Sequence, residues 1–215
     1  QPKHCSHMLG VHPDYRGYGL GAALKRAQWQ LVRHQGLDLI TWTFDPLLSR
    51  NAYLNIARLG AVCNKYVRDA YGNMRDTLNA GIASDRFQVD WWVNSKRVNH
   101  RLSREVRDPL ELDHYLSGEV RILNPARHTP DGGMEISEWK GYHTDPYETF
   151  MLVEIPVNFL GLKSLNPAMA GRWRQHTRQI FQDLFSLGYL VTDFVHQSGE
   201  TPRSYYVLCH GDSTL

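Results

Sequence analysis

The alternation of apolar and polar positions divides the first hundred residues into helices and strands. Directly after a glycine-rich segment, apolar residues recur at helical spacing, and Gly36 supplies a stop signal. The pattern predicts an amphipathic helix whose apolar stripe is Leu20, Leu24, Ala27 and Leu31. An apolar run predicts a buried strand over residues 37–44, and a second helix contains Asn51-Ala52 and ends at Leu59-Gly60. Another strand is expected from about residue 61, and strict alternation predicts one over residues 87–93.

The second half shows the same kinds of pattern after a stretch rich in Arg and Asn at residues 94–108, which predicts a linker or a surface helix. Asn166-Pro167 is an N-cap followed by proline at the first helical position, so a helix should run from there to about residue 187. Strands are expected at residues 119–123, 134–139, 149–155, 189–196 and 204–210, with a turn at residues 130–133.

These elements predict an α/β protein, with a mixed sheet flanked by helices in residues 1–98 and a smaller α/β unit in residues 110–215. The second unit echoes the order of the first but has no comparable glycine-rich loop. Arg172, Arg174 and Arg178 project at helical spacing from its long helix. They are either a solvated helix face or a site for a carboxylate.

Composition narrows the function classes. The chain has 215 residues, of which 42% are hydrophobic and 21% charged, and no apolar run approaches the length of a membrane span. A net charge of +2 gives no broad field for nucleic acid, so neither nucleic acid nor a membrane is an expected partner. Three cysteines, far apart in sequence, indicate buried thiols in a reducing compartment, and we expect a cytoplasmic protein. Cys5 and His7 alone do not make a metal site, so no metal is expected.

The most informative segment is Arg16-x-x-Gly19-x-Gly21, with Gly17 as a further small residue, between an apolar segment at residues 8–11 and the first helix. A glycine-rich turn entering a helix presents free backbone N–H groups, which form a site for a phosphate group. No Gly-Lys-Ser/Thr follows, which excludes a Walker loop, and the third glycine of a Rossmann fingerprint is absent.

This segment, Val11-His12-Pro13-x-x-Arg16-Gly17-x-Gly19-Leu20-Gly21, resembles the coenzyme A binding segment of the GNAT superfamily of N-acyltransferases over residues 3–95. Further residues resemble a poorly characterised GNAT-like family over the whole chain: Asp45-Pro46, Arg50-Asn51-Ala52, Arg58-Leu59-Gly60-Ala61, Tyr71-Gly72, Ser84-Asp85-Arg86-Phe87, Trp91, Trp173-Arg174, Thr177-Arg178 and Gly188-Tyr189.

The resemblance implies a GNAT-like sheet, an acyl-CoA donor such as acetyl-CoA, and a small amine or amino acid as acceptor. It implies that a strand at residues 9–11 pairs with the pantetheine arm, beside a gap before the strand at residues 37–44. The cofactor-binding residues that it implies are Leu9, Gly10, Val11, Arg16, Gly17, Tyr18, Gly19, Leu20, Gly21, Ala22 and Asn51. Backbone N–H groups near Val11 would stabilise the developing oxyanion.

The catalytic residues are less defined. Many members of the superfamily use a Tyr shortly before Leu-Gly as general acid, but Ile56 stands three residues before Leu59 here. Tyr53, one helical turn earlier, shares about the same face and is either that acid or a packing residue. His7 is a candidate general base, with a strand histidine as the alternative, and the base is otherwise a carboxylate or a water chain.

Several strands and helices normally precede this segment in the superfamily, whereas this chain begins at Gln1. The open arrangements are a fragment, which we favour, a second chain, or replacement by the C-terminal half, and a homodimer is also open. We therefore predict an N-acyltransferase that uses acetyl-CoA or succinyl-CoA. A catalytically silent acyl-CoA binding module and a general nucleotide-binding module are the alternatives.

Overall fold

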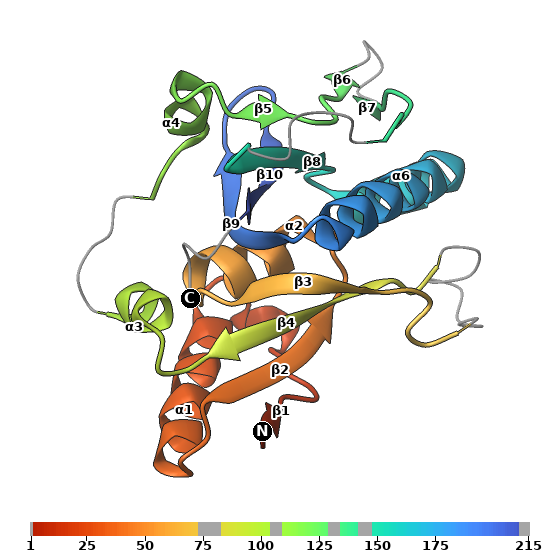
Figure 1. The fold of residues 1–215 in the computed structure, drawn as a ribbon. Helices are drawn as coiled ribbons and strands as arrows, with labels where there is room; N and C mark the ends of the chain where they lie inside the picture. Colours follow the sequence, from red (N-terminus) through yellow and green to blue (C-terminus); the bar gives the residue numbers. More distant parts are fainter. Residues whose placement is uncertain (1, 73–82, 104–108, 129–133, 142–147, 211–215) are drawn as a thin grey trace.

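The structure is a computed structural model that describes residues 2–72, 83–103, 109–128, 134–141 and 148–210 (Figure 1). Its helices are η1 (Pro13–Tyr15), α1 (Leu20–His34), α2 (Ser49–Ala52), η2 (Tyr53–Arg58), α3 (Lys96–Leu102), α4 (Leu112–Ser117), α5 (Phe159–Leu165) and α6 (Pro167–Ser186). Its strands are β1 (His4–Cys5), β2 (Leu39–Phe44), β3 (Val62–Val67), β4 (Arg86–Trp92), β5 (Arg121–Ile122), β6 (Arg127–His128), β7 (Met134–Glu135), β8 (Phe150–Ile155), β9 (Tyr189–Gln197) and β10 (Arg203–His210).

Strands from both halves form one mixed sheet in the order β1-β2-β4-β3-β9-β10-β8-β5, which confirms the α/β class. Figure 1 shows β1 at the lower edge and β5 at the upper edge. The pairing pattern repeats from each edge inward: β1 and β5 lie parallel to β2 and β8, and the next two neighbours on each side pair antiparallel. The two halves meet where Cys63 of β3 pairs with Val191 of β9. Read from its two edges inward, the sheet therefore shows the same sequence of pairings in both halves. In chain order, the hairpin β6–β7 comes between β5 and β8, as α1 comes between β1 and β2.

One face of the sheet carries the main core. Phe87 and Trp91 alternate along β4 with partly exposed residues, so both side chains lie on the same face. The Phe87 ring lies 4.8 Å from that of Phe181 on α6, and Trp91 donates a 2.7 Å hydrogen bond to the carbonyl of Leu59 at the end of η2. Helices α6 and η2, one from each half, therefore cover the same face.

A smaller core lies on the other face of the second half, where Leu112 and Tyr115 of α4 pack against Tyr205 and Val207 of β10. Figure 1 shows α4 and α6 on opposite sides of β8, β9 and β10. The upper strands are thus enclosed between helices, as the apolar residues on both faces of β10 require.

The sequence pattern predicts most elements correctly, including α1, β2, the second helix, β4, β8, α6, β9 and β10. The strands expected at residues 119–123 and 134–139 shrink to the two-residue strands β5 and β7. The turn expected at residues 130–133 lies outside the described residues. The strand expected at residues 9–11 is wrong, because β1 ends at Cys5 and residues 9–11 take no regular structure. Gly10 and Pro13 disfavour a strand there, since glycine weakens a ladder and proline cannot donate to it.

The orientation of α1 also differs from the expectation. Leu20, Leu24 and Leu31 of the predicted apolar stripe are 41%, 50% and 56% exposed. Lys25 and Val32 are the buried residues of the helix instead. Gly21, on that same inner face, lies beside Leu54 of η2: a methyl group placed on it would be in ordinary contact with Leu54, at 3.6 Å. Of the thiols, Cys63 and Cys209 are buried as expected, but Cys5 is exposed.

Buried ion pairs join α6 to the first half. Arg174 donates both of its terminal nitrogens to Asp45, at 2.8 and 2.6 Å, and Arg178 donates to both oxygens of Asp85 at 2.7 Å. Arg174 is 4% exposed and Asp85 is fully buried. Neither alternative for these two arginines, a solvated face or a free carboxylate site, holds, because both are occupied by carboxylates of the first half.

Candidate functional site

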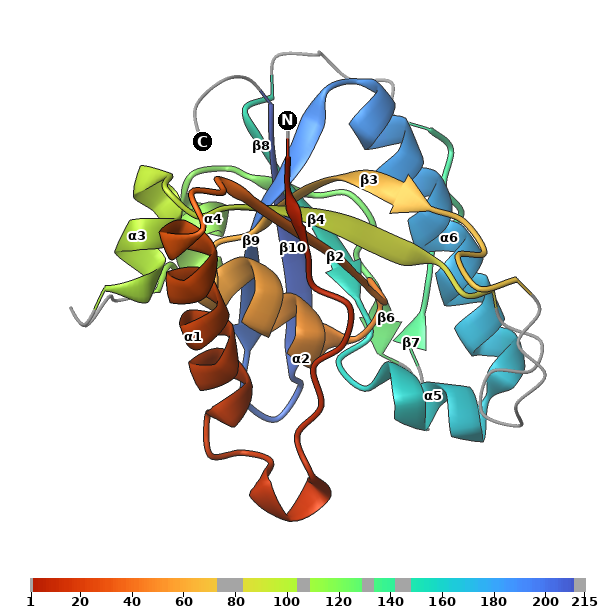
Figure 2. The same ribbon diagram turned by 90° about the horizontal axis from the view of Figure 1, so that it is seen from below.

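The loop before α1 has the conformation that its glycines permit. Gly17 and Gly19 have φ values of +91° and +75°, in the left-handed region, and Gly19 is the N-cap of α1. Arg16 fastens the loop, because its Nε donates a 3.0 Å hydrogen bond to the carbonyl of Val11. Figure 2 shows the loop with η1 projecting from one end of the molecule.

The entrance of α1 presents unpaired backbone donors. The first amide of the helix region with an internal partner is that of Ala23, which donates to the Gly19 carbonyl. Within the described residues, no protein acceptor pairs with the N–H groups of Leu20, Gly21 or Ala22, and no side chain caps the helix. Three adjacent amides at the positive end of a 15-residue helix form an anion site.

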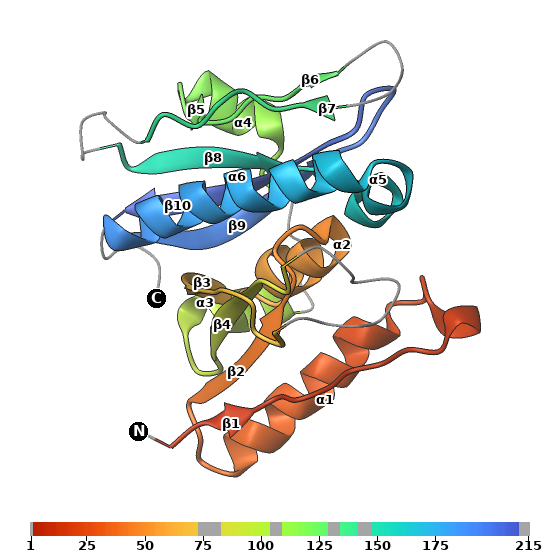
Figure 3. The same ribbon diagram turned by 90° about the vertical axis from the view of Figure 1, so that its right-hand side faces the viewer.

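Beside this loop, β1 and β2 separate. His4 and Cys5 pair with Ile40 and Thr41, and the amide of residue 6 makes one more bond to the Thr41 carbonyl. Beyond that point the chain leaves β2 and runs along α1 to the loop (Figure 3). We call this divergence the fork. His7 lies just beyond it, exposed and without a hydrogen bond or ion pair among the described residues. It does not lie in a strand as expected, because β1 has already ended.

Helix η2 lies next to the loop. The Leu54 side chain faces Gly21, while Asn51 and Tyr53 are exposed. Tyr53 is 41% exposed, so it is not a residue of the main core, whereas Ile56, three residues before Leu59, is completely buried. A bound ligand could therefore reach the Tyr53 side chain, whereas it could not reach Ile56.

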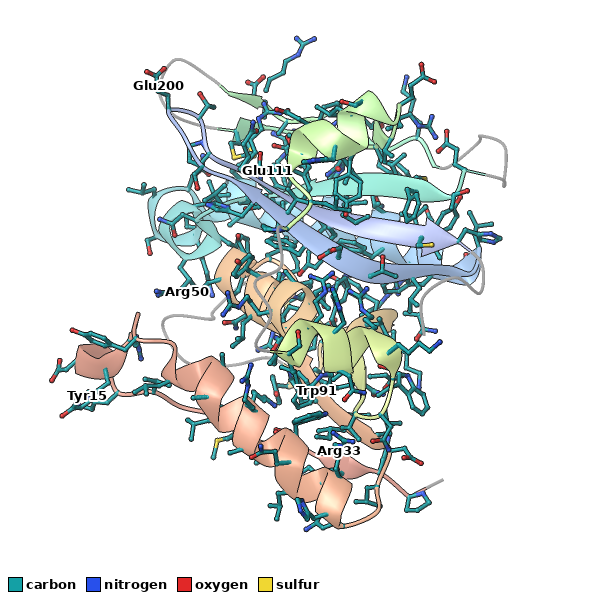
Figure 4. All side chains as sticks on the ribbon, turned by 90° about the vertical axis from the view of Figure 1, so that its left-hand side faces the viewer. Tyr15, Arg33, Arg50, Trp91, Glu111 and Glu200 are labelled. Atoms are coloured by element: carbon teal, nitrogen blue, oxygen red, sulfur yellow. The ribbon has the colours of Figure 1, made fainter. Side chains whose placement is uncertain are left out.

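Tyr53 also lines a cavity of about 420 Å³. The other described lining residues come from the entry to α4 and from the end of β9: Pro109, Leu110, Glu111, Leu112, Asp113, Phe194, Val195, His196, Gln197 and Ser198. We call this the α4–β9 cavity. Figure 4 shows Arg50 of α2 between the loop that carries Tyr15 and the segment that carries Glu111, so α2 and η2 separate the loop from the cavity.

The imidazole of His196 is held by a buried pair of serines. Its Nδ1 lies 3.0 Å from Ser204 Oγ, which lies 2.8 Å from Ser49 Oγ. Ser204 is fully buried and Ser49 is 8% exposed. The sequence pattern did not single out this histidine. Ser204 lies 8 residues from His196, and Ser49 lies 155 residues from Ser204, so spacing along the chain does not connect them. The only signal was a polar residue at the end of a predicted strand.

A buried lysine lies at the fork. Lys25 is 3% exposed, and its Nζ donates to Ser6 Oγ at 2.9 Å and to Gln28 Oε1 at 3.1 Å. The ammonium group also lies 3.6 Å from the centroid of the Trp42 ring, a cation–π contact. Burial lowers the pKa of Lys25 to about 8. Its spacing of seven residues from Val32, close to two full helical turns, was the available sign that Lys25 faces inward.

Lys25→Met should change how stability depends on pH. Between about pH 8 and 10.5 the unfolded chain keeps this lysine protonated while the folded protein has released the proton, so the group makes the folded state more stable as pH rises. We expect urea unfolding to show the wild type gaining stability relative to Lys25→Met across this range. The exposed Lys96→Met is the control, and a difference between wild type and Lys25→Met that is constant with pH would contradict the prediction.

Among the described residues, no three His, Cys, Asp or Glu side chains come together in an arrangement that could hold a metal ion. In the same part of the chain, no helix is long and apolar enough to cross a bilayer.

Comparison of the chain with protein-family models, curated proteins and solved structures finds no match. A functional proposal therefore rests on the residues of the loop, the fork and the cavity.

Proposed function

We propose that the protein is an acyl-CoA-dependent N-acyltransferase of the GNAT type, acting on a small amine or amino acid. The observation that carries the proposal is the row of unpaired amides at Leu20, Gly21 and Ala22, which opens to solvent next to the fork. A pyrophosphate is the anion expected at such a helix entrance. The parallel β1–β2 pair, with α1 as its crossover, supports the proposal because it places this loop beyond the end of β1.

The donor would lie along the loop and the fork. The amides of residues 17–22 would hold the pyrophosphate, Asn51 would contact the phosphate or pantetheine, and the pantetheine arm would follow residues 9–11 into the fork. Gly17 and Gly19 have open space where a side chain would stand, so a phosphate has room to approach. Exposed Leu9 and Tyr18 would give the cofactor apolar contacts.

The reaction would be direct transfer. The amine nitrogen attacks the thioester carbonyl, the C–N bond forms as the nitrogen gives up one proton to solvent, and the C–S bond breaks with release of the CoA thiolate. Tyr53 would give its phenolic proton to that thiolate, in line with its exposure. The acyl group is acetyl or succinyl. Arg174 and Arg178 already bind Asp45 and Asp85, so they give succinyl no support, and acetyl-CoA is the first donor to test.

Calorimetry tests the donor site. We expect CoA and acetyl-CoA to bind with micromolar dissociation constants and ATP and NAD to bind at least about tenfold more weakly, a difference of 1.4 kcal/mol. Equal binding of ATP would favour a general nucleotide site, and no binding of CoA or acetyl-CoA would overturn the proposal. Thiol release measured with acetyl-CoA and a panel of amines then distinguishes an enzyme from a silent acyl-CoA binding module. The buried Ile56, which stands where the resemblance leads us to expect an accessible Tyr, favours the silent module.

A further inference from the structure

Two features are open at the β1 edge of the sheet: the outer side of β1 itself and the leucine stripe of α1, which runs along β1 (Figure 3). Among the described residues, β2 pairs with one side of β1 and no strand pairs with the other. The stripe is exposed along its whole length, at Leu20, Leu24, Ala27 and Leu31. Unpaired strand edges and exposed apolar patches are both places where folded proteins associate.

The contacts of α1 show which way the stripe faces. Gln28 lies 3.1 Å from His4 of β1, whereas Trp29 donates a 2.8 Å hydrogen bond to the backbone just after β4, on the far side of β2. Successive residues of an α-helix are turned by about 100°, so Leu24 and Leu31 follow Gln28 around the helix. They lie on the side away from Trp29. The stripe therefore faces outward past β1, away from the rest of the sheet.

The outer side of β1 presents the backbone of Cys5. The amide of Ser6 donates to Thr41 of β2, and successive residues of a strand direct their backbone groups to opposite edges. The N–H and C=O groups of Cys5 therefore point outward. Its side chain lies on the face opposite α1, because both neighbours, His4 and Ser6, contact α1, and its thiol is exposed.

We propose that this edge, the outer side of β1 together with the leucine stripe of α1, is the interface of a homodimer. A two-fold axis perpendicular to the sheet pairs β1 with the β1 of a second copy in antiparallel orientation, so that the sheet continues from one copy into the other. The same axis places the two α1 helices antiparallel on one face of the joined sheet, with their stripes in contact. Each copy contributes the same surface, as a closed two-fold dimer requires.

The spacing of the elements fits this arrangement. Neighbouring strands lie about 4.8 Å apart, so the axis lies about 2.4 Å outside β1. Helix α1 contacts β1 through Gln28 and β2 through Lys25, so it lies about midway between the two strands, about 2.4 Å inside β1. The two α1 helices are then about 10 Å apart, which is the separation of packed helices.

The strand and the helix give the same position for the axis. In β1 the axis passes through the outward-facing pair of Cys5 residues. The neighbours of Cys5 contact positions 25 and 28 of α1, so Cys5 is level with residues 26–27 of the helix. An axis at that level sets the small side chain of Ala27 against its own copy and Leu24 against the partner's Leu31. The 4-3-4 spacing of the stripe thus matches the register that β1 imposes.

Charge favours a second copy as the occupant. The stripe has no charged member, and the arginines of α1, Arg26 and Arg33, lie on the flank of Trp29, where Arg33 stacks over the indole ring. Two copies therefore meet without opposing like charges. Leu20 lies seven residues from the axis, about 10 Å along the helix, so the unpaired amides at the entrance of α1 stay open in the dimer.

Sedimentation equilibrium of the whole chain, from about 1 to 100 µM, tests the interface. One helix pair and one strand pair form a contact at the small end of stable interfaces, so we expect a monomer–dimer equilibrium with a dissociation constant of about 1–10 µM. Leu24→Glu should raise this constant about tenfold or more, because it buries an unpaired carboxylate against the partner's Leu31. Leu165→Glu, at an exposed leucine of α5 outside this edge, is the matched control and should leave the constant unchanged.

A double variant tests the antiparallel register. In Leu24→Glu/Leu31→Lys, each new carboxylate meets the new ammonium group of the other copy. The dissociation constant should therefore fall about tenfold below that of Leu24→Glu.

Mild oxidation with diamide gives a second readout. Directly opposed residues of a hydrogen-bonded antiparallel pair have Cα atoms about 5.5 Å apart, within the range of a disulfide. We expect a disulfide-linked dimer in the wild type, none in Cys5→Ser, and much less in Leu24→Glu at the same concentration. Cys63 and Cys209 are buried and should not contribute.

A chain that stays monomeric up to about 100 µM would overturn the proposal. Equal dissociation constants in the wild type and Leu24→Glu, or equal crosslinking in the wild type and Cys5→Ser, would overturn it as well. Monomers that sediment with anionic lipid vesicles, and lose this property in Leu24→Glu, would make the stripe a lipid-binding face instead. None of these outcomes depends on CoA, so the proposed donor site stands or falls by its own calorimetric test.

Discussion

Asp85→Ala is expected to destabilise the protein by about 3–5 kcal/mol, the cost of leaving a buried charged partner unpaired. The Asp85 carboxylate is fully buried and accepts hydrogen bonds from Arg178, from the Tyr66 hydroxyl at 2.8 Å and from the Asp69 amide at 3.1 Å. Its removal leaves Arg178 with the more exposed Asp69, at 3.7 Å, and breaks one of the two ion pairs that join α6 to the first half. Urea unfolding at pH 7 measures the loss. Arg121→Ala, in the more exposed pair with Glu148, should cost less than about 1 kcal/mol.

The Asp85 carboxylate should also make the free energy of unfolding sensitive to acid. Burial alone raises the pKa of Asp85, but hydrogen bonds from Arg178, Asp69 and Tyr66 outweigh it, and the net pKa lies below the ordinary 3.8. The stabilisation is therefore complete above about pH 3.8 and is lost as the pH falls through the lowered pKa of the folded state. Asp85→Asn should show a shallower loss of stability on acidification. An equal slope in wild type and Asp85→Asn would contradict this account.

Sequence patterns predicted the parts of the fold that depend on local order. Apolar periodicity located α1 and α6, Asn166 and Pro167 marked the start of α6, and the glycines marked the loop. In α1 the periodicity misled, because the leucine stripe is exposed while Lys25 and Val32 face the sheet. A helix pattern gives an apolar face but not the direction in which tertiary packing turns it.

Long-range partners could not be predicted. The ion pair between Arg178 and Asp85 joins residues 93 apart, and Ser49 meets Ser204 across 155 residues. Spacing along the chain carries no information about such contacts. The arginines of α6 were therefore interpreted as solvated or ligand-binding, whereas two of them, Arg174 and Arg178, each pair with a carboxylate of the first half. The candidate site divides in the same way. The loop is local and was found, but His196 reaches its position only through the pairing of β9 with β10 and was missed.

Conformation, rather than side-chain chemistry, should decide donor binding at the loop. Gly19→Val is expected to weaken CoA binding by about tenfold or more, because a β-branched residue at the φ of +75° found there costs about 1–2 kcal/mol. Relief of that strain would turn the amides of Leu20 and Gly21 away from a common phosphate. Calorimetric titration with CoA measures the effect.

Gly36→Val is the matched control for this prediction. Gly36 follows α1 at its other end, has a φ of +70° and, like Gly19, has open space where a side chain would stand. The two substitutions therefore introduce the same strain into the same helix, and their losses of stability should be similar. Only Gly19 lies at the entrance of α1, where the unpaired amides are. Gly36→Val should then keep wild-type affinity for CoA. If both variants lost affinity equally, CoA binding would depend on the stability of α1 as a whole, and the loop would not be the pyrophosphate site.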